Sequence, residues 1–416
     1  MKNALNEYQL IVVGGGASGF MGAITAAELG TSSVLILEAS ARYLEKVRIS
    51  GGGRCNVTNS IWNPSELVQN YPRGSVQLKS SFSKFSSGDV VSWFEERGLA
   101  LKIEKDGRIF PKSNSSEDVL KCLKNQAKKF NVNTLLHKSV REIKVTAKDS
   151  FLVKCSNGDI YIAKNILLST GSSPIGKKIA ENLGHKIVSP VPSIFGFTLS
   201  SHDLKSFSGT SFEHAFIRLK CKNKVFSGEG RILITHKGLS GPAVLRLSAF
   251  AARELHNQKY NATLEVNWIN KNLDEVVKVF NKYREVFPKK RIINSFPFDY
   301  LPKKFLRYLC CKNNIDNENK WANLSSKNAF TLAKSLTKDS FNMKGRSPNG
   351  DEFVTAGGIS LDEINFKYME SKKIKGLYFA GEIIDIDGVT GGFNFQHCWT
   401  SAWIAGKSIT SKFVSS

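Results

Sequence analysis

The feature that constrains this chain most is a glycine-rich turn between a short apolar strand and an alanine-rich helix. Residues 8–13 predict the strand, residues 17–29 the helix, and residues 33–37 a second buried strand. The turn, Gly14-Gly15-Gly16-Ala17-Ser18-Gly19, fits the GxGxxG pattern, and Glu38 follows it by about 20 residues at the end of the second strand. This unit predicts dinucleotide binding, because the helix N-terminus offers free N–H groups to a pyrophosphate.

Each glycine of the pattern has its own expected role. Gly14 permits the tight turn, Gly16 lets the pyrophosphate approach the backbone, and Gly19 lets the helix pack against the strand. The carboxylate of Glu38 is expected to accept hydrogen bonds from ribose hydroxyls and to repel a 2′-phosphate. The alternative interpretation is a glycine-rich turn of an ordinary α/β protein without a nucleotide.

The rest of the chain predicts a nucleotide-binding domain that is interrupted by an insertion. Residues 138–145 and 151–155 predict a β-ribbon, and residues 160–163 and 165–169 predict two further strands. Short alternating strands follow after residue 191, helical periodicity covers 272–340, and a last strand at 376–382 precedes a closing helix at 396–411. We therefore expect an α/β fold with a Rossmann-like domain of residues 1–190 and 350–416, a β-rich insert of residues 191–271 and 341–349, and a helical insert of residues 272–340.

Composition narrows the class of protein. The 416 residues are 41% hydrophobic, which suffices for a sizeable core. No apolar run is long enough for a membrane span or a signal-peptide core, so a cytoplasmic location is expected. The seven cysteines are scattered without a CxxC pair or a histidine cluster, which predicts free thiols and no metal site.

Charge points to a polyanionic partner. The chain has 59 Lys and Arg against 36 Asp and Glu, a net charge of +23, and residues 271–350 alone have 17 against 7, a net of +10. Basic residues interleaved with aromatic ones favour an RNA-binding groove with stacking platforms. The alternatives are a lysine-rich genome bias and a solvated helical face over core aromatics. The basic candidates are Lys289, Lys290, Arg291, Lys303, Lys304 and Arg307, and the aromatic ones are Phe287, Phe296, Phe298, Tyr300, Phe305 and Tyr308.

Further glycine-rich segments identify a family resemblance. The segment Ile49-Ser50-Gly51-Gly52-Gly53-Arg54-Cys55-Asn56-Val57-Thr58-Asn59 follows the acidic residue, and a second cluster spans residues 381–394. Together with the GxGxxG turn and the segments 107–111, 235–243 and 356–360, they resemble the HI0933-like bacterial flavoproteins over nearly the whole chain. The resemblance implies an extended FAD, a β-rich insert and a small helical domain.

The resemblance also implies roles for individual residues. Gly14, Gly16 and Gly19 would meet the pyrophosphate, and Glu38 would meet the adenosine ribose. The backbone of Val140 would bind adenine, and Arg54 and Asn56 would lie beside the flavin ring. The other residues expected around the cofactor are Ala17, Ser18, Ser50, Gly52, Gly53, Cys55, Thr170, Gly171, Gly381, Glu382, Asp387, Gly391, Gly392, Phe393 and Asn394.

Members of this family are linked to reduction of uridine in large-subunit ribosomal RNA, reduction of enones in bile acids, and oxidation of aminoketones. The charge of the insert favours ribosomal RNA as the partner, with a small-molecule substrate as the alternative and NAD(P)H as the expected electron donor. A flavoprotein without turnover is a third alternative. Reduction of a conjugated C=C also needs a proton donor, and Cys55, His236 and, more weakly, His397 are the candidates, with Arg54 beside them. The alternative is a structural role, which is the commoner case for a buried cysteine and an equal alternative for His236.

Overall fold

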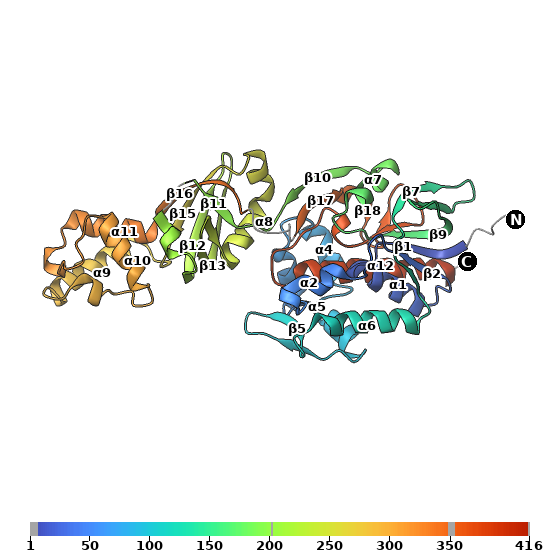
Figure 1. Cartoon of the computed structure of the whole chain (residues 1–416), viewed down its shortest axis with the longest axis horizontal. Helices are drawn as coiled ribbons and strands as arrows, with labels where there is room; N and C mark the ends of the chain where they lie inside the picture. The colour runs from blue at the N-terminus through green and yellow to red at the C-terminus, as the bar shows by residue number, and fades with distance from the viewer. Residues whose placement is uncertain (1–6, 201–202, 348–353, 415–416) are drawn as a thin grey trace. The chain divides into compact units, whose positions relative to one another are not determined.

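The computed structural model describes residues 7–200, 203–347 and 354–414, and the chain divides into two compact units (Figure 1). Unit 1 comprises residues 1–191 and 354–416, and unit 2 comprises residues 192–353. The predicted α/β class with a β-rich and a helical insert is confirmed. The predicted domain boundary at 349–350 lies outside the described residues.

Unit 1 is built on a parallel sheet whose five central strands are in the order β20-β9-β1-β2-β6. The side chains of Leu10 to Val13 in β1 are buried, as expected of a parallel strand covered on both faces. Two short strands extend the sheet beyond β20, and the ribbon β7–β8 pairs with β9. The bounds are β1 Glu7–Val13, β2 Val34–Leu37, β6 Asn133–Leu135, β7 Val140–Val145, β8 Phe151–Cys155, β9 Ile160–Leu168, β18 Ile364–Asn365, β19 Glu370–Ser371 and β20 Leu377–Phe379.

One strand prediction was wrong. Residues 160–163 and 165–169 were expected to form two strands, but β9 runs without interruption from Ile160 to Leu168. Its first half pairs with β8 and its second half with β20, while β1 lies along the other edge. The exposed Lys164 breaks the apolar pattern without breaking the strand, because the change of partner occurs there.

Helices α1 and α12 pack closely within unit 1 (Figure 1). A β-carbon on Gly406 of α12 would lie 2.6 Å from the carbonyl oxygen of Gly22 in α1. The bounds are α1 Ala17–Glu28, α2 Glu45–Gly53, α3 Pro64–Leu67, α4 Ser75–Phe82, α5 Ser87–Glu95, α6 Ser116–Lys129, α7 Pro174–Asn182 and α12 Phe393–Val414. The remaining strands of unit 1 are β3 Thr58–Asn59, β4 Leu101–Ile103 and β5 Arg108–Pro111 in one small sheet, and β10 Ile187–Pro192 with β17 Thr355–Ile359 in another.

The described part of unit 2 contains a closed six-stranded barrel and four α-helices. The barrel order is β11-β14-β13-β12-β15-β16, and α8 packs on β13. One hydrophobic cluster extends from the barrel through the helices, so the β-rich and helical parts share a core. The bounds are β11 Phe197–Leu199, β12 Ser211–Lys220, β13 Val225–Thr235, β14 Gly238–Ser240, α8 Pro242–Asn257, β15 Ala262–Asn267, α9 Leu273–Val286, α10 Lys303–Lys312, α11 Ser326–Thr337 and β16 Asp339–Arg346. Within the described part of the chain, no helix is long and apolar enough to cross a membrane.

The close approach of α1 and α12 gives a stability prediction. Gly406→Ala is expected to lower the free energy of unfolding by about 1–3 kcal/mol, because the new methyl group meets backbone that cannot move aside. Urea unfolding of the full chain measures this. Gly88→Ala in α5 is the control, since the nearest atoms to its β-carbon would be 3.8 and 3.9 Å away. Equal urea midpoints for Gly406→Ala and wild type would contradict the packing described.

Candidate functional site: a glycine-lined cradle in unit 1

The GxGxxG turn connects the end of β1 to the start of α1, as predicted. Gly14 has a φ of +107°, and a β-carbon there would lie 2.6 Å from the carbonyl oxygen of Ser169. A β-carbon on Gly19 would lie 1.9 Å from the carbonyl oxygen of Gly14. These two glycines are therefore required by packing within the protein.

Gly16 differs from both, because a β-carbon there would meet no atom within 4 Å. Gly16 is the N-cap of α1 and has an ordinary φ of −89°, so neither strain nor crowding requires glycine at this position. The first N–H groups of a helix lack partners within the helix and are available to an anion. Open space beside these groups fits a dinucleotide pyrophosphate.

Glu38 lies at the end of β2 against the same turn. Its Oε2 accepts a hydrogen bond of 2.7 Å from the Gly15 amide, and its Oε1 accepts one of 2.8 Å from the Ser40 amide. The backbone of Glu38 also bonds to Leu135 and Lys138, so the chain that leads into β7 passes beside it. Val140 is the first residue of β7, and its side chain is buried, which leaves its backbone role toward adenine as a prediction.

The second glycine motif forms a loop at the end of α2. Ser50 has extended geometry, and Gly51, Gly52 and Gly53 have φ values of +58°, +68° and +82°. Side chains seldom adopt this left-handed conformation, so the backbone itself requires glycine here. β-Carbons on Gly52 and Gly53 would meet no atom within 4 Å, and both residues are exposed. The loop therefore offers a bare backbone surface to a ligand.

Arg54 is held in place next to this loop. Its Nη1 donates to Glu104 Oε1 at 2.7 Å, and its guanidinium lies over the ring of Phe110, 4.0 Å from the ring centroid. Arg108 donates to the other oxygen of Glu104 at 3.2 Å. The side chain of Arg54 remains about one-third exposed, so its outer N–H groups can reach a ligand.

The third glycine segment packs directly against the second. The side chain of Asn59 donates to the Gly391 carbonyl at 3.0 Å, and a β-carbon on Gly392 would lie 2.5 Å from the Thr58 carbonyl oxygen. The amide of Asn56, oriented to satisfy its neighbours, accepts from the Gly392 N–H at 2.9 Å. The structure therefore brings together two motifs that are more than 330 residues apart in the sequence.

The turn that precedes α12 is fixed by its own side chains. Asn394 exchanges two hydrogen bonds of 2.9 Å with the backbone of Gly388, and the hydroxyl of Tyr71 donates to the Phe393 carbonyl at 2.6 Å. The ring of Phe393 is buried, so only its backbone is available to a ligand. Helix α12 begins at Phe393, three residues before the start expected at residue 396.

A lysine that the sequence analysis missed connects the remaining predicted residues. Lys46 of α2 donates to Glu382 at 2.7 Å and to the hydroxyl of Ser172 at 3.0 Å. Glu382 also accepts from the Thr355 amide at 3.2 Å, and a β-carbon on Gly171 would lie 3.7 Å from its carboxylate. Lys46 thus joins the loop that follows Thr170 to the segment at Gly381. A single exposed lysine in a lysine-rich chain gave no signal for this role.

Two of the predicted roles are corrected by burial. Cys55 has no exposed surface, and burial raises the pKa of its thiol to about 12. The thiol cannot touch a ligand, and its φ of +58° shows that the residue shapes the loop. Asp387 is also fully buried, and both of its oxygens accept from Arg73, so it does not face a ribityl phosphate. Arg73 carried no sequence signal.

The two candidate histidines have different environments. His236 is exposed in the turn between β13 and β14 of unit 2, and its role as a proton donor stays a prediction. His397 is buried in α12, where its Nε2 lies 3.3 Å from the Gly381 carbonyl oxygen. Burial lowers the pKa of His397 to about 4, so its imidazole is neutral at pH 7.

The predicted stacking platforms of unit 2 are mostly core residues. Phe305 and Phe298 are buried, and Phe287, Phe296 and Tyr308 pack against the same hydrophobic cluster. Their rings contact one another, as in the 5.7 Å pair of Phe296 and Phe298. Phe287, Phe296 and Tyr308 are half-buried, and Tyr300, the sixth aromatic candidate, is 55% exposed. The sequence did not show which rings are buried, because each helix places its apolar residues on one side and its basic residues on the other. The six basic candidates are exposed, as predicted.

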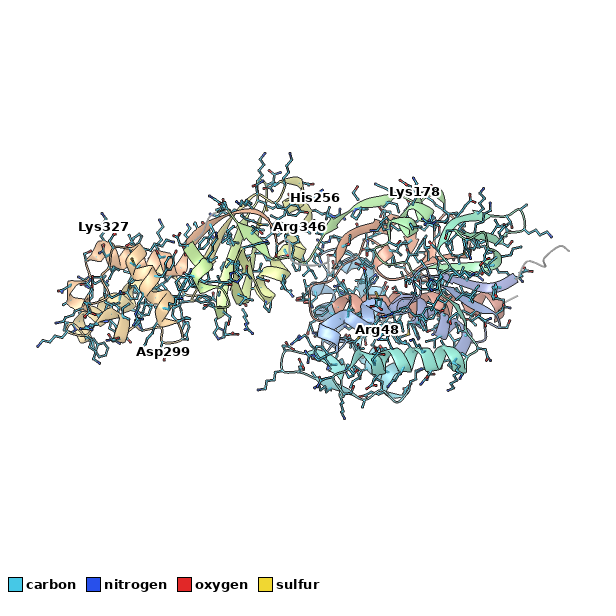
Figure 2. The ribbon with its side chains drawn as sticks, in the orientation of Figure 1. Arg48, Lys178, His256, Asp299, Lys327 and Arg346 are labelled. Atoms are coloured by element: carbon cyan, nitrogen blue, oxygen red, sulfur yellow. The ribbon has the colours of Figure 1, made fainter. Side chains whose placement is uncertain are left out.

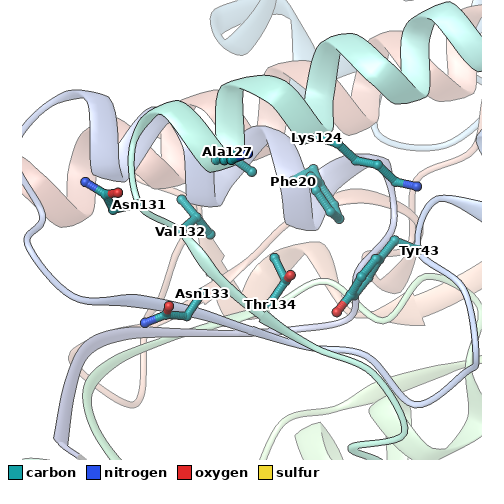
Figure 3. Close-up of a pocket in the computed structure, with 9 residues that line it drawn as sticks. Phe20, Tyr43, Lys124, Ala127, Asn131, Val132, Asn133 and Thr134 are labelled. Carbon is teal, nitrogen blue, oxygen red and sulfur yellow. The ribbon is translucent and has the colours of Figure 1, made fainter.

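A cavity of about 520 Å³ lies beside the candidate site, between α6, β6 and the start of α1 (Figure 3). Tyr43, which lines it, also packs on the GxGxxG turn: a β-carbon on Gly15 would lie 2.8 Å from the Tyr43 ring. Burial raises the pKa of the Tyr43 hydroxyl. None of the predicted site residues lines this cavity, so it is separate from the glycine-lined cradle.

Comparison with known proteins identifies the family. Residues 8–408 match the family described as HI0933-like protein Rossmann domain. The chain belongs to this family. A curated relative, the ribosomal RNA dihydrouridine synthase of Haemophilus influenzae, is 28% identical over 96% of this chain and 98% of its own length. The 3-dehydro-bile acid delta(4,6)-reductase of Clostridium scindens is 26% identical over 96% of this chain and 98% of its own length.

The fold of the family extends to solved structures with little sequence identity. The 3-ketosteroid delta1-dehydrogenase of Sterolibacterium denitrificans has a TM-score of 0.53 at 12% identity, over 98% of this chain and all of that chain. The 3-ketosteroid-delta4-(5alpha)-dehydrogenase of Rhodococcus jostii has a TM-score of 0.51 at 13% identity, over 97% of each chain. At these identities the likeness establishes a shared fold.

Burial of Cys55 gives a reactivity prediction. In native protein at pH 8, iodoacetamide is expected to alkylate the exposed Cys311 and to leave Cys55 unmodified, because alkylation needs an accessible thiolate. Mass spectrometry of tryptic peptides measures both sites, and both should react after unfolding in guanidinium. Rapid alkylation of Cys55 in the native protein would restore it as a candidate proton donor.

Proposed function

We propose that the protein is an FAD-dependent oxidoreductase that reduces a C=C bond conjugated to a carbonyl, and that its substrate is a uridine of large-subunit ribosomal RNA. The observation that carries the cofactor assignment is the cradle of Gly16, Gly52 and Gly53, where β-carbons would meet open space. The contact between the loop at 50–59 and the turn at 388–394 supports a ligand longer than a pyrophosphate.

Reduced FAD would supply a hydride for the β-carbon of the conjugated bond, a proton must reach the α-carbon, and the chain supplies the binding and the charge. The N-terminus of α1 would face the pyrophosphate, and the N-terminus of α12 would place a positive dipole end toward the flavin, where it favours the anionic reduced form. Arg54, fixed by Glu104 and Phe110, is proposed to donate to the carbonyl oxygen on which negative charge develops. NAD(P)H is the proposed electron donor.

The RNA assignment is supported by charge and by the relatives. The segment 271–350 has a net charge of +10, which a steroid or an aminoketone does not need and a phosphate backbone does. The relative from Haemophilus influenzae is named for ribosomal RNA dihydrouridine synthesis. Uracil is itself an enone-like substrate, and it must be unpaired to reach a flavin. Action on ribosomal RNA would place the protein in the cytoplasm.

The second candidate is reduction of a small enone. It is favoured by the bile-acid reductase of Clostridium scindens, which matches this chain over nearly the same length as the RNA-modifying relative and at similar identity. Both candidate functions reduce a conjugated C=C bond. They differ in the substrate, which is a polyanion in the first and a small molecule in the second.

The cofactor proposal predicts a yellow protein that releases FAD, and not FMN, on heating. Gly16→Val is expected to be colourless with an unchanged circular dichroism spectrum, because its side chain meets only the open space of the cradle. Gly88→Val in α5 is the matched control and should remain yellow. A folded Gly16→Val protein that retains stoichiometric FAD would contradict the assignment of the cradle.

The substrate proposal predicts that dithionite-reduced protein is reoxidised by protein-free ribosomal RNA under anaerobic conditions, with dihydrouridine detected by mass spectrometry. The return of the oxidised-flavin absorbance, at about 450 nm, measures the reoxidation. A synthetic steroid enone is the comparison substrate. Protein that stays reduced with RNA but is rapidly reoxidised by the enone would establish the second candidate instead.

A further inference from the structure

Helix α11 exposes one aromatic ring between two lysines. Lys327, Phe330 and Lys334 follow one another at spacings of three and four residues, so they lie on the same face of the helix. All three are exposed, Phe330 to 48% of its surface. Figure 2 labels Lys327, whose side chain projects away from the ribbon of the helical part. Two helical turns separate the lysines along the axis, which is about 10 Å.

The orientation of this face is fixed by the opposite side of the helix. Ala329, Leu332, Ala333 and Leu336 are buried in the core of unit 2. The side chain of Ser325 accepts a hydrogen bond of 3.1 Å from the Asn328 amide and caps the start of the helix. Turning Phe330 into the core would require the helix to rotate and expose these four buried residues. The exposure of Phe330 is therefore fixed by the fold.

The face has no acidic residue of its own. Neither α11 nor the adjacent α10 contains an Asp or Glu, whereas α9, which also packs on α11, contains Asp274, Glu275 and Glu285. Among the described residues, Lys327 and Lys334 make no ion pair, whereas the nearby Lys312 pairs with Asp339 at 2.8 Å. Arg284 of α9 adds a further cation at the start of the helix, where its guanidinium lies 3.3 Å from the Ser326 hydroxyl. The two lysines therefore flank an exposed apolar ring.

We propose that this face, defined by Lys327, Phe330 and Lys334, binds an unpaired segment of RNA, with a base stacked on Phe330 and phosphates at the two lysines. The proposal rests on the proposed function. In it, Phe330 is the stacking platform in place of Phe298 and Phe305, whose rings are buried. Flat aromatic rings accept any base, and base stacking on them is a common mode of single-strand binding. A membrane surface is disfavoured because one ring offers little apolar area to a bilayer.

The test measures, by fluorescence anisotropy, how a fluorescein-labelled 12-nucleotide oligouridine binds the full-length protein. Salt is varied from about 50 to about 200 mM, so that the slope of log affinity against log salt can be determined. Phe330→Ala is expected to weaken binding by about tenfold with an unchanged salt slope, because it removes stacking but no charge. Lys327→Ala/Lys334→Ala is expected to lower the slope by about 1.4, since each phosphate contact on a single strand contributes about 0.7. Phe330→Trp should retain the affinity.

Matched controls keep the test specific. Val286→Ala removes another exposed apolar side chain from the helical part, and Lys148→Ala/Lys372→Ala removes two exposed lysines from unit 1. Both controls should bind oligouridine like the wild type. Vesicles of phosphatidylcholine with phosphatidylserine test the membrane alternative with the same variants.

The outcomes separate this surface from the enzymatic proposal. Oligouridine binding that weakens about tenfold with Phe330→Ala supports the surface, even if RNA never reoxidises the reduced protein. Binding that is absent in the wild type, or equally strong in Phe330→Ala, overturns the surface, even if uridine is reduced. Binding to the vesicles that depends on Phe330, without binding to oligouridine, would overturn it in favour of a lipid partner.

Discussion

The candidate site depends on the contact between the loop after α2 and the turn before α12. Asn56, Thr58 and Asn59 meet Gly391, Gly392 and Gln396 through hydrogen bonds and through a backbone approach that only glycine permits. The nearby indole of Trp399 in α12 donates to the Val57 carbonyl at 2.9 Å. Without these contacts the GxGxxG turn would be a phosphate site alone, and a longer ligand would have no support beyond it.

The glycines of the site divide into two physical classes. Gly14, Gly19 and Gly392 are glycines because neighbouring backbone leaves no room for a β-carbon. Gly16 has room and an ordinary φ, so the protein alone does not require glycine there. Gly16 combines this room with the free N–H groups at the start of α1, and the combination supports a bound cofactor more strongly than the motif as a whole.

The sequence predicted the elements that depend on local pattern. The strand–turn–helix at the GxGxxG turn, the β7–β8 ribbon and the closing helix α12 were all visible in the spacing of apolar residues and glycines, although α12 begins at Phe393 and not at residue 396. The sequence could not predict which distant residues would form hydrogen bonds and ion pairs with these elements in the folded protein. Lys46, Arg73 and Glu104 are ordinary charged residues in the sequence, and their roles come from Glu382, Asp387 and Arg54, which lie 50 or more residues away. The burial of Cys55 was likewise not predicted, because burial cannot be read from a glycine-rich neighbourhood.

Hydrogen–deuterium exchange with and without FAD tests the central claim most directly, namely that motifs at both ends of the chain form one cradle. The account predicts that FAD slows amide exchange in all three segments, residues 14–19, 50–56 and 388–394. Exchange in the β3–β4–β5 sheet should not change, except where this sheet contacts the loop. Slower exchange at 14–19 alone, with 50–56 and 388–394 unchanged at saturating FAD, would contradict it.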